Sequence, residues 1–100
     1  MTNLLSTLGL AKRAGALKIG ETQVYESIQS IRYLFLANDV GPSTKNKVEG
    51  KCHFYHIPIN ASFNRDELSK SIGTLNTVMI GVVDAGFVEL FKEDPYGKTR

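Results

Sequence analysis

The apolar residues of this chain recur at helical spacing in some segments and gather in short continuous runs in others. Five segments combine the helical pattern with residues that start or stop a helix. The predicted helices are one that contains Leu4, Leu5, Leu8 and Ala11 and closes at Gly15, one from about Glu21 to Ser30, one from Pro42 to about Tyr55, one between Asn64 and Gly73, and one between Asp84 and Asp94. The predicted strands are Ala16–Ile19, Tyr33–Ala37, Ile57–Asn60 and Val78–Val83.

The predicted helices and strands alternate along the chain. Val78–Val83 is the strongest strand, so we expect it at the centre of the sheet, and Tyr33–Ala37 has the continuous apolar character of a strand buried on both faces. Pro58 has no backbone N–H to donate and favours an edge position for the third strand. This alternation predicts an α/β fold with helices on both faces of a mostly parallel or mixed sheet.

Two helix starts carry specific signals. Asn64 precedes Glu67 by three residues, as in a capping box, and Phe63 and Leu68 occupy the two positions of a hydrophobic staple. Asp84 directly follows the predicted central strand, where catalytic acids occur in α/β folds, but its residue type and position are more typical of an N-cap. Both features indicate local helix stability rather than chemistry.

The length of 100 residues fits one small domain, which we place at residues 1–94 with a tail at 95–100. Residues 1–51 hold seven Lys or Arg against four Asp or Glu, whereas residues 52–100 hold five against six. Concentration of positive charge in the first half indicates a polyanionic partner, although scattered solvated charge explains the count equally well.

Cysteine usage and hydropathy indicate the compartment. Cys52 is the only cysteine, so an intramolecular disulfide is excluded and a reducing environment is the natural interpretation. No apolar run approaches the roughly 20 residues that a membrane span needs, and the first residues lack the pattern of a signal peptide. We therefore expect a cytoplasmic protein with no membrane partner.

Sequence motifs for catalysis and cofactor binding are missing. There is no Walker-type loop, and the two glycines of "GALKIG" are five residues apart, which does not fit a dinucleotide-binding triplet. Cys52, His53 and His56 are one ligand short of a structural zinc site, and no Ser or Cys lies in a nucleophile elbow. We expect a protein that is not an enzyme and that uses no metal, cofactor or small-molecule substrate.

The junction at Gly20 is the remaining candidate site. The first turn of the following helix presents free backbone N–H groups and the positive end of the helix dipole. Thr22 and Gln23 lie in that turn, and glutamine can form two hydrogen bonds with a base edge. Lys18 precedes the junction, and Lys12–Arg13 is close in the sequence. On these residues alone, an RNA contact and an ordinary helix start are equally well supported.

Three segments carry a family resemblance: "GLAKRAG", "GETQV" and "ANDVGPSTK". In their order and spacing they resemble the L-seven-Ae superfamily of kink-turn RNA-binding proteins, and most closely its bacterial YlxQ-like branch. The similarity continues through "FNRDELSKSIG" and "VMIGVVDAGF" and so covers almost the whole chain. It implies a three-layer α/β/α sandwich with a mixed, mostly four-stranded central sheet. It also implies a ribosome-associated protein that binds kink-turn or other bulged RNA.

The resemblance further implies the residues that contact RNA. They are Lys12, Arg13, Lys18, Gly20, Glu21, Thr22, Gln23, Gly73, Thr74 and Leu75. In this family the glycine lets the RNA backbone approach closely, the residues at the start of the helix face the bases, and the basic residues contact phosphate. The loop Ile72–Asn76 corresponds to the family loop that covers a flipped-out nucleotide, a surface suited to RNA with splayed bases.

The charges of three other residues leave alternatives open. Lys45 and Lys47 either neutralise phosphates or are solvated residues of the third helix. Glu26 stands where most relatives have a lysine, and a carboxylate there would repel phosphate unless it turns away. Glu26 therefore favours the alternative function, a protein–protein interaction module that retains the fold with a weakened RNA site.

Overall fold

The computed structural model describes residues 4–93 and places them in alternating helices and strands. The elements are α1 (Leu4–Arg13), β1 (Leu17–Ile19), α2 (Glu21–Glu26), the 3-10 turn η1 (Ile28–Ser30), β2 (Tyr33–Leu36), α3 (Pro42–Tyr55), β3 (Ile59–Asn60), α4 (Arg65–Ile72), β4 (Met79–Val82) and α5 (Ala85–Glu93). All four predicted strands are present, each one or two residues shorter than predicted. The predicted helix stop at Asp94 and the tail at 95–100 lie outside the described residues.

The four strands form one mixed sheet in the order β1-β4-β2-β3. β4 is antiparallel to both of its neighbours, and Ile80 lies between Ile19 of β1 and Phe35 of β2. β3 pairs in parallel with β2 and is an edge strand, as Pro58 predicted. The Pro58 carbonyl accepts a hydrogen bond from the backbone N–H of Leu34, with 3.0 Å between nitrogen and oxygen. The inner position predicted for the fourth strand is confirmed.

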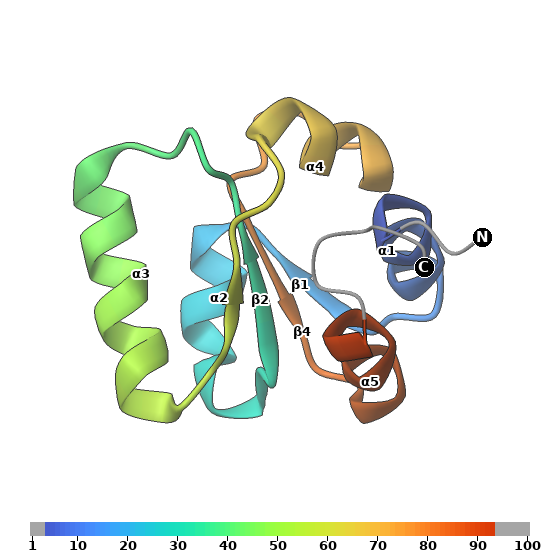
Figure 1. The fold of residues 1–100 in the computed structure, drawn as a ribbon, viewed down its shortest axis with the longest axis horizontal. Coiled ribbons are helices and arrows are strands. Elements are labelled where there is room, and N and C mark those ends of the chain that lie inside the picture. Colours follow the sequence, from blue (N-terminus) through green and yellow to red (C-terminus); the bar gives the residue numbers. More distant parts are fainter. Residues whose placement is uncertain (1–3, 94–100) are drawn as a thin grey trace.

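Helices cover both faces of this sheet, which confirms the three-layer α/β/α sandwich (Figure 1). α1, α4 and α5 pack on one face, and α2 and α3 pack on the other. Successive strand residues point to opposite faces, so Phe35 joins the core under α1, α4 and α5 while Leu34 joins the core under α2 and α3. Both β2 and β4 are buried along their whole length.

The prediction of one helix from Glu21 to Ser30 is wrong. α2 ends at Glu26, Ser27 leaves the helical region with φ −111° and ψ 17°, and η1 follows as a tighter turn. Ile31 is then extended, and its side chain fills the space over Gly81 of β4, where a Cβ would clash with it. The tighter turn lets the apolar residues after α2 reach the core before the chain enters β2.

The predicted helix starts are confirmed. In the capping box, the backbone N–H of Glu67 donates to the side-chain oxygen of Asn64 over 2.8 Å, and the backbone N–H of Asn64 donates to the Glu67 carboxylate over 3.0 Å. Asp84 acts as the N-cap of α5, because its carboxylate accepts from the backbone N–H groups of Gly86 and Phe87. These bonds satisfy helix N–H groups that would otherwise lack partners.

Candidate RNA interface

The start of α2 lies at the end of the sheet where β1 ends and β4 begins, together with the loop that leads into β4. The backbone N–H of Gly20, which precedes α2, donates to the carbonyl of Met79, the first residue of β4, over 3.0 Å. The loop between α4 and β4 carries the predicted residues Gly73, Thr74 and Leu75. A backbone hydrogen bond therefore joins Gly20 to the start of the strand into which this loop leads.

Gly20 has a backbone conformation that only glycine adopts readily. Its φ is 90° and its ψ is 162°, in a region that is essentially closed to residues with a Cβ. A Cβ built at Gly20 would meet no atom within 4 Å, so the space beside its Cα is open. Glycine is required at position 20 because of its backbone conformation. The open space beside its Cα leaves room for the backbone of a ligand.

Gln23 is held in place by the strand before α2. Its side-chain oxygen accepts a hydrogen bond from the backbone N–H of Ile19 over 3.0 Å. The amide NH₂ of Gln23 points away from this bond, and its two donors have no partner within residues 4–93. Glu21, Thr22 and Gln23 are all exposed, so the first turn of α2 presents its polar side chains to solvent.

The loop after α4 is fixed at its base and exposed at its tip. Gly73 ends α4 in the left-handed region, with φ 71°. The hydroxyl oxygens of Thr74 and Thr77 are 2.6 Å apart, and the backbone N–H of Thr77 donates to the hydroxyl of Ser69 over 2.8 Å. Leu75 at the tip is 90% exposed. An apolar side chain held outward on an anchored loop is suited to contact an unstacked base.

Lys12 and Arg13 lie at the α4 end of this loop, on the last turn of α1. The Lys12 ammonium donates to the backbone carbonyl of Ile72 over 2.8 Å, and both basic residues line a hollow of about 330 Å³ together with Gly73. Lys12 thus stabilises the end of α4 and adjoins the loop at the same time. The structure places this pair next to Gly73 and leaves Gly20 at the other end of the loop.

Lys18 lies on the edge strand β1, close to Gly20. Its neighbours Leu17 and Ile19 pack against the core under α1, α4 and α5, so Lys18 points to the face that carries α2. Lys18 pairs in register with Gly81, which has no side chain, and is half-buried. This geometry brings one predicted phosphate contact to the same side of the sheet as the first turn of α2.

The sequence did not predict the contact of the Tyr25 ring with two lysines of α3. The ring lies between α2 and α3, with the Lys47 ammonium 4.9 Å and the Lys51 ammonium 5.1 Å from the ring centroid. Burial, followed by the nearby Glu21 carboxylate, raises the pKa of Tyr25 to about 12, so the ring is neutral at physiological pH. The i, i+4 spacing of the two lysines on α3 was the available signal, but it does not identify the ring that they share.

Glu26 ends α2 and is exposed. Each residue of a helix is rotated by 100° about the helix axis from the one before. The Glu26 side chain therefore points in a direction closer to that of Thr22 than the side chains of Tyr25 and Gln23 do. Within residues 4–93 the carboxylate of Glu26 forms no ion pair. The negative charge of Glu26, which stands where most relatives have a lysine, therefore lies on the face that would meet RNA.

The Cys52 and His53 region has the character of an ordinary helix end. Cys52 is buried, whereas His53 and His56 are exposed, and His56 ends α3 with a left-handed φ of 59°. Among the described residues, no three His, Cys, Asp or Glu side chains are grouped closely enough to hold a metal ion. Burial, followed by the nearby Glu49 carboxylate, raises the pKa of the Cys52 thiol to about 11.

We expect the stability of the protein to fall as pH rises from about 9 to about 11 because of Cys52. Its pKa is about 11 in the fold against an ordinary 9.0, so its contribution is complete below pH 9 and is lost as pH rises through 11. Urea unfolding at pH 8, 9, 10 and 11 measures this loss. Cys52→Ala should show a shallower decline, because only Tyr25 and other groups still titrate. Equal declines in the two proteins would contradict this assignment.

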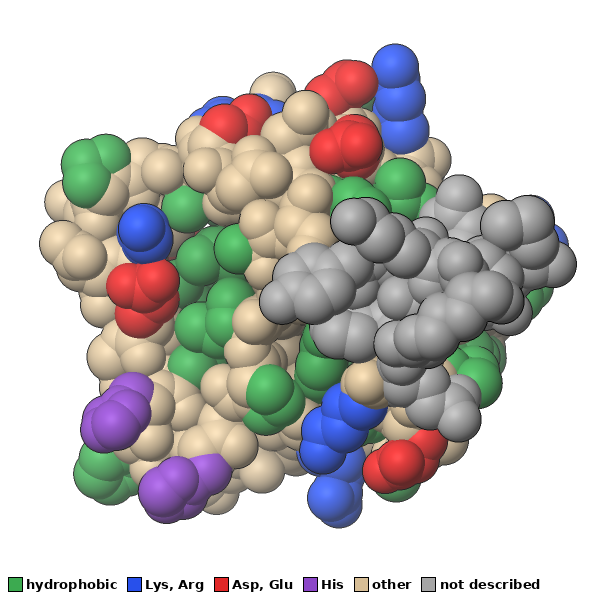
Figure 2. Space-filling view, viewed as in Figure 1, with side chains coloured by type: hydrophobic (Ala, Val, Ile, Leu, Met, Phe, Trp, Pro, Cys, Tyr) green, Lys and Arg blue, Asp and Glu red, His purple; other side chains and the backbone are tan. Residues whose placement is uncertain are grey.

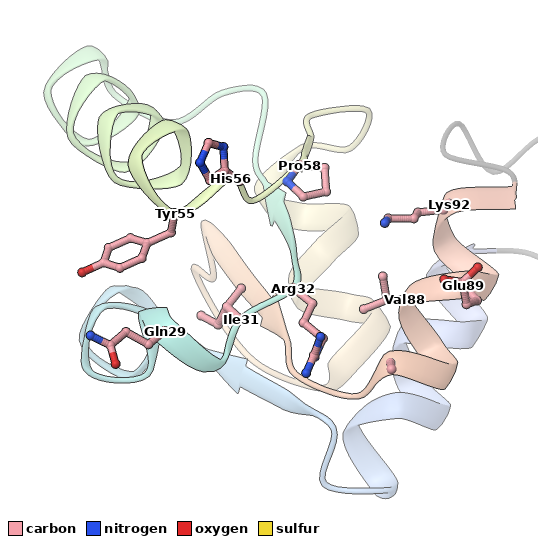
Figure 3. A pocket seen from close by; sticks show the side chains of 10 residues that line it. Gln29, Ile31, Arg32, Tyr55, His56, Pro58, Val88, Glu89 and Lys92 are labelled. Carbon is pink, nitrogen blue, oxygen red and sulfur yellow. The ribbon is translucent and has the colours of Figure 1, made fainter.

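Another hollow of about 380 Å³ lies at the opposite end of the sheet, where β2 begins and β4 ends (Figure 3). Arg32, Tyr55, His56, Glu89 and Lys92 are among the side chains that line it. This lining combines both signs of charge, and the residues predicted to bind RNA are all elsewhere. On the face in Figure 2, Lys and Arg side chains are scattered among acidic ones and form no continuous patch. The charge of this face does not by itself mark a binding site.

Solved structures share this architecture. A protein of unknown function from Bacillus halodurans superposes with a TM-score of 0.84 and 41% identity over 90% of this chain and 93% of its own. The Giardia lamblia 15.5kD RNA binding protein superposes with a TM-score of 0.76 over 90% of this chain and 79% of its own, and its identity of 14% supports the fold alone. The class defined by the fold is the three-layer α/β/α sandwich that both of these structures share with this chain.

Curated relatives identify the branch. RNA-binding protein YlxQ of Enterococcus faecium is 36% identical over 91 residues, which is 89% of this chain and 87% of the relative. RNA-binding protein YlxQ of Bacillus subtilis (strain 168) is 37% identical over 82 residues, which is 80% and 82%. No family model matches the chain. The chain belongs to the YlxQ family.

No helix within residues 4–93 has both the length and the apolar character needed to cross a bilayer.

Proposed function

We propose that this protein is a non-catalytic RNA-binding protein that recognises kink-turn or similarly bulged RNA, in association with the ribosome and in the cytoplasm. The geometry around Gly20 carries the proposal. Gly20 leaves open space beside its Cα at the start of α2, and the amide NH₂ of Gln23 donates to no other residue among residues 4–93. RNA binding by the YlxQ relatives, as their names state, supports the same partner.

In the proposed complex the start of α2 enters the RNA at the kink. Thr22 and Gln23 contact base edges, and the helix dipole and the exposed basic residues attract phosphates. Leu75 packs on an unstacked nucleotide, because its side chain is 90% exposed on a loop that is anchored at both ends. Lys12 and Arg13 contact the backbone near that nucleotide, since they line the hollow beside Gly73.

Gln23→Ala is expected to weaken binding of a kink-turn RNA about tenfold or more, and to weaken binding of a plain duplex less. Loss of base-directed hydrogen bonds of this kind costs about 1–3 kcal/mol, which applies only where the bases are accessible. Titration of labelled kink-turn and duplex RNA with the unmodified protein and with Gln23→Ala measures the loss of affinity on each RNA. Equal losses on both RNAs would remove Gln23 from base recognition.

Gln29→Ala is the matched control, because Gln29 is also an exposed glutamine but lines the hollow at the opposite end of the sheet. It should bind both RNAs like the unmodified protein.

The affinity of the unmodified protein for kink-turn RNA should also fall steeply with salt concentration, as expected when several phosphates are contacted. Lack of measurable binding at low salt to any bulged RNA would refute the proposed function and favour the protein-interaction alternative.

A further inference from the structure

We propose that Tyr25 holds Lys47 and Lys51 together as a paired phosphate-binding site along the flank of α2, where they contact the RNA helix adjoining the kink. This inference rests on the proposed RNA-binding function and extends its surface from α2 onto α3. The three residues come from two helices, so only the tertiary structure brings them together.

The two lysine side chains converge on one aromatic ring. Both ammonium groups lie about 5 Å from the centroid of Tyr25 (4.9 Å and 5.1 Å), within the range of a cation–π interaction. Lys47 and Lys51 are four residues apart on α3, which places their Cα atoms about 6 Å apart along the helix axis. The ring therefore limits the positions of two long side chains that would otherwise sample many rotamers.

Neither lysine of this pair forms an ion pair within the described part of the chain. The ion pairs among residues 4–93 join Arg65 with Asp39 and Lys70 with Asp66, and neither involves Lys47 or Lys51. The Tyr25 ring that both lysines contact is itself neutral at physiological pH. Two full positive charges held close together, with no carboxylate paired to either, attract a polyanion more strongly than the ion-paired lysine of α4.

The pair adjoins the proposed base-contacting residues. Tyr25 follows Glu21 by four residues and Thr22 by three, so its ring lies one helical turn from the start of α2 on a neighbouring face. Figure 1 shows α2 and α3 side by side with both helices beginning at the same edge of the molecule. Lys47, in the second turn of α3, is the nearer of the two to that edge. An RNA that meets the first turn of α2 would extend along this flank.

A positively charged pair at this position also offsets Glu26. The carboxylate of Glu26 is exposed at the end of α2 and would repel a phosphate at that point. Tyr25 lies on one side of Thr22 around the helix and Glu26 on the other, which follows from 100° of rotation per residue. The arrangement directs the RNA backbone toward α3 and away from Glu26.

The test is the salt dependence of kink-turn RNA binding by full-length variants. Lys47→Gln and Lys51→Gln should each reduce the slope of log affinity against log salt by about 0.7–0.9, and the double variant by the sum, because each removes one phosphate contact. Lys92→Gln is the control, since Lys92 is an exposed lysine at the opposite end of the sheet. The slope of log affinity against log salt should be unchanged in this variant. An unchanged slope in the double variant would overturn the inference.

Substitutions of Tyr25 test whether the ring positions the lysines. Tyr25→Phe keeps the ring and should keep the affinity, whereas Tyr25→Leu should weaken binding severalfold. In the Lys47→Gln, Lys51→Gln background, Tyr25→Leu should add no further loss, because the groups that it positions are gone. An equal loss with and without the lysines would show that the ring acts on stability alone and would overturn its positioning role.

Failure of this inference is distinguishable from failure of the proposed function. Steep salt dependence in the unmodified protein, with an unchanged slope in the double lysine variant, contradicts the paired site and leaves RNA binding in place. Absence of kink-turn binding by the unmodified protein at low salt contradicts both. Because Lys47 is exposed and Lys51 is partly exposed, their replacement by glutamine should leave the melting temperature nearly unchanged.

Discussion

Gly20→Ala is expected to reduce affinity for kink-turn RNA at least tenfold. Alanine at φ 90° and ψ 162° is strained by about 1–3 kcal/mol, so the backbone at the start of α2 should rotate and move the first helical turn. The added methyl would also occupy the open space beside the Gly20 Cα, where the protein itself offers no atom within 4 Å. RNA titration at a temperature well below the melting temperature of the variant measures the loss.

Gly15→Ala is the control for strain. Gly15 also has a positive φ, 72°, and a Cβ there would likewise meet no atom within 4 Å. Gly15 precedes β1, whereas Gly20 follows it, and the carbonyl of the next residue, Ala16, accepts from the backbone N–H of Val83 at that opposite end of the strand. Both variants should lose stability, but only Gly20→Ala should lose RNA affinity. Equal affinity in the two variants would contradict a close approach of RNA at Gly20.

Phe35→Ala is expected to lower the free energy of unfolding by about 3–5 kcal/mol, the usual cost of removing a fully buried phenylalanine. Phe35 is 0% exposed at the centre of the sheet, and its ring packs edge-on against Phe91 with centroids 4.9 Å apart and against Tyr33 at 5.3 Å. A loss of this size is a large part of the 5–15 kcal/mol that stabilises a typical domain. Urea unfolding followed by circular dichroism measures it.

Phe54→Ala is the matched control, because Phe54 is 73% exposed near the end of α3. Its contact with the Tyr55 ring, at 4.9 Å between centroids, is on the surface, so its removal should change stability by no more than about 0.5 kcal/mol. Comparable losses in the two phenylalanine variants would contradict the assignment of the core to the sheet face under α1, α4 and α5.

Much of the candidate site could be predicted from the sequence because its residues are local. Gly20, Thr22 and Gln23 lie within four consecutive positions, and the helix that begins directly after Gly20 has first-turn residues typical of a helix start. The hydrogen bond from Ile19 to Gln23 could not be predicted, because side-chain direction depends on how β1 meets α2. For the same reason, the sequence did not indicate that Lys12 donates to the carbonyl of Ile72, which is sixty residues away.

By itself the sequence determined the order of helices and strands, the capping box at Asn64, the edge position of β3 and the inner position of β4. These features depend on hydrophobic period, residue type and the missing N–H of proline, which are properties of neighbouring residues. Only the tertiary structure decided that α2 ends at Glu26, because Ile31 must reach the space over Gly81. It also decided that the Tyr25 ring contacts both Lys47 and Lys51, since contacts between α2 and α3 depend on how both helices pack on the sheet.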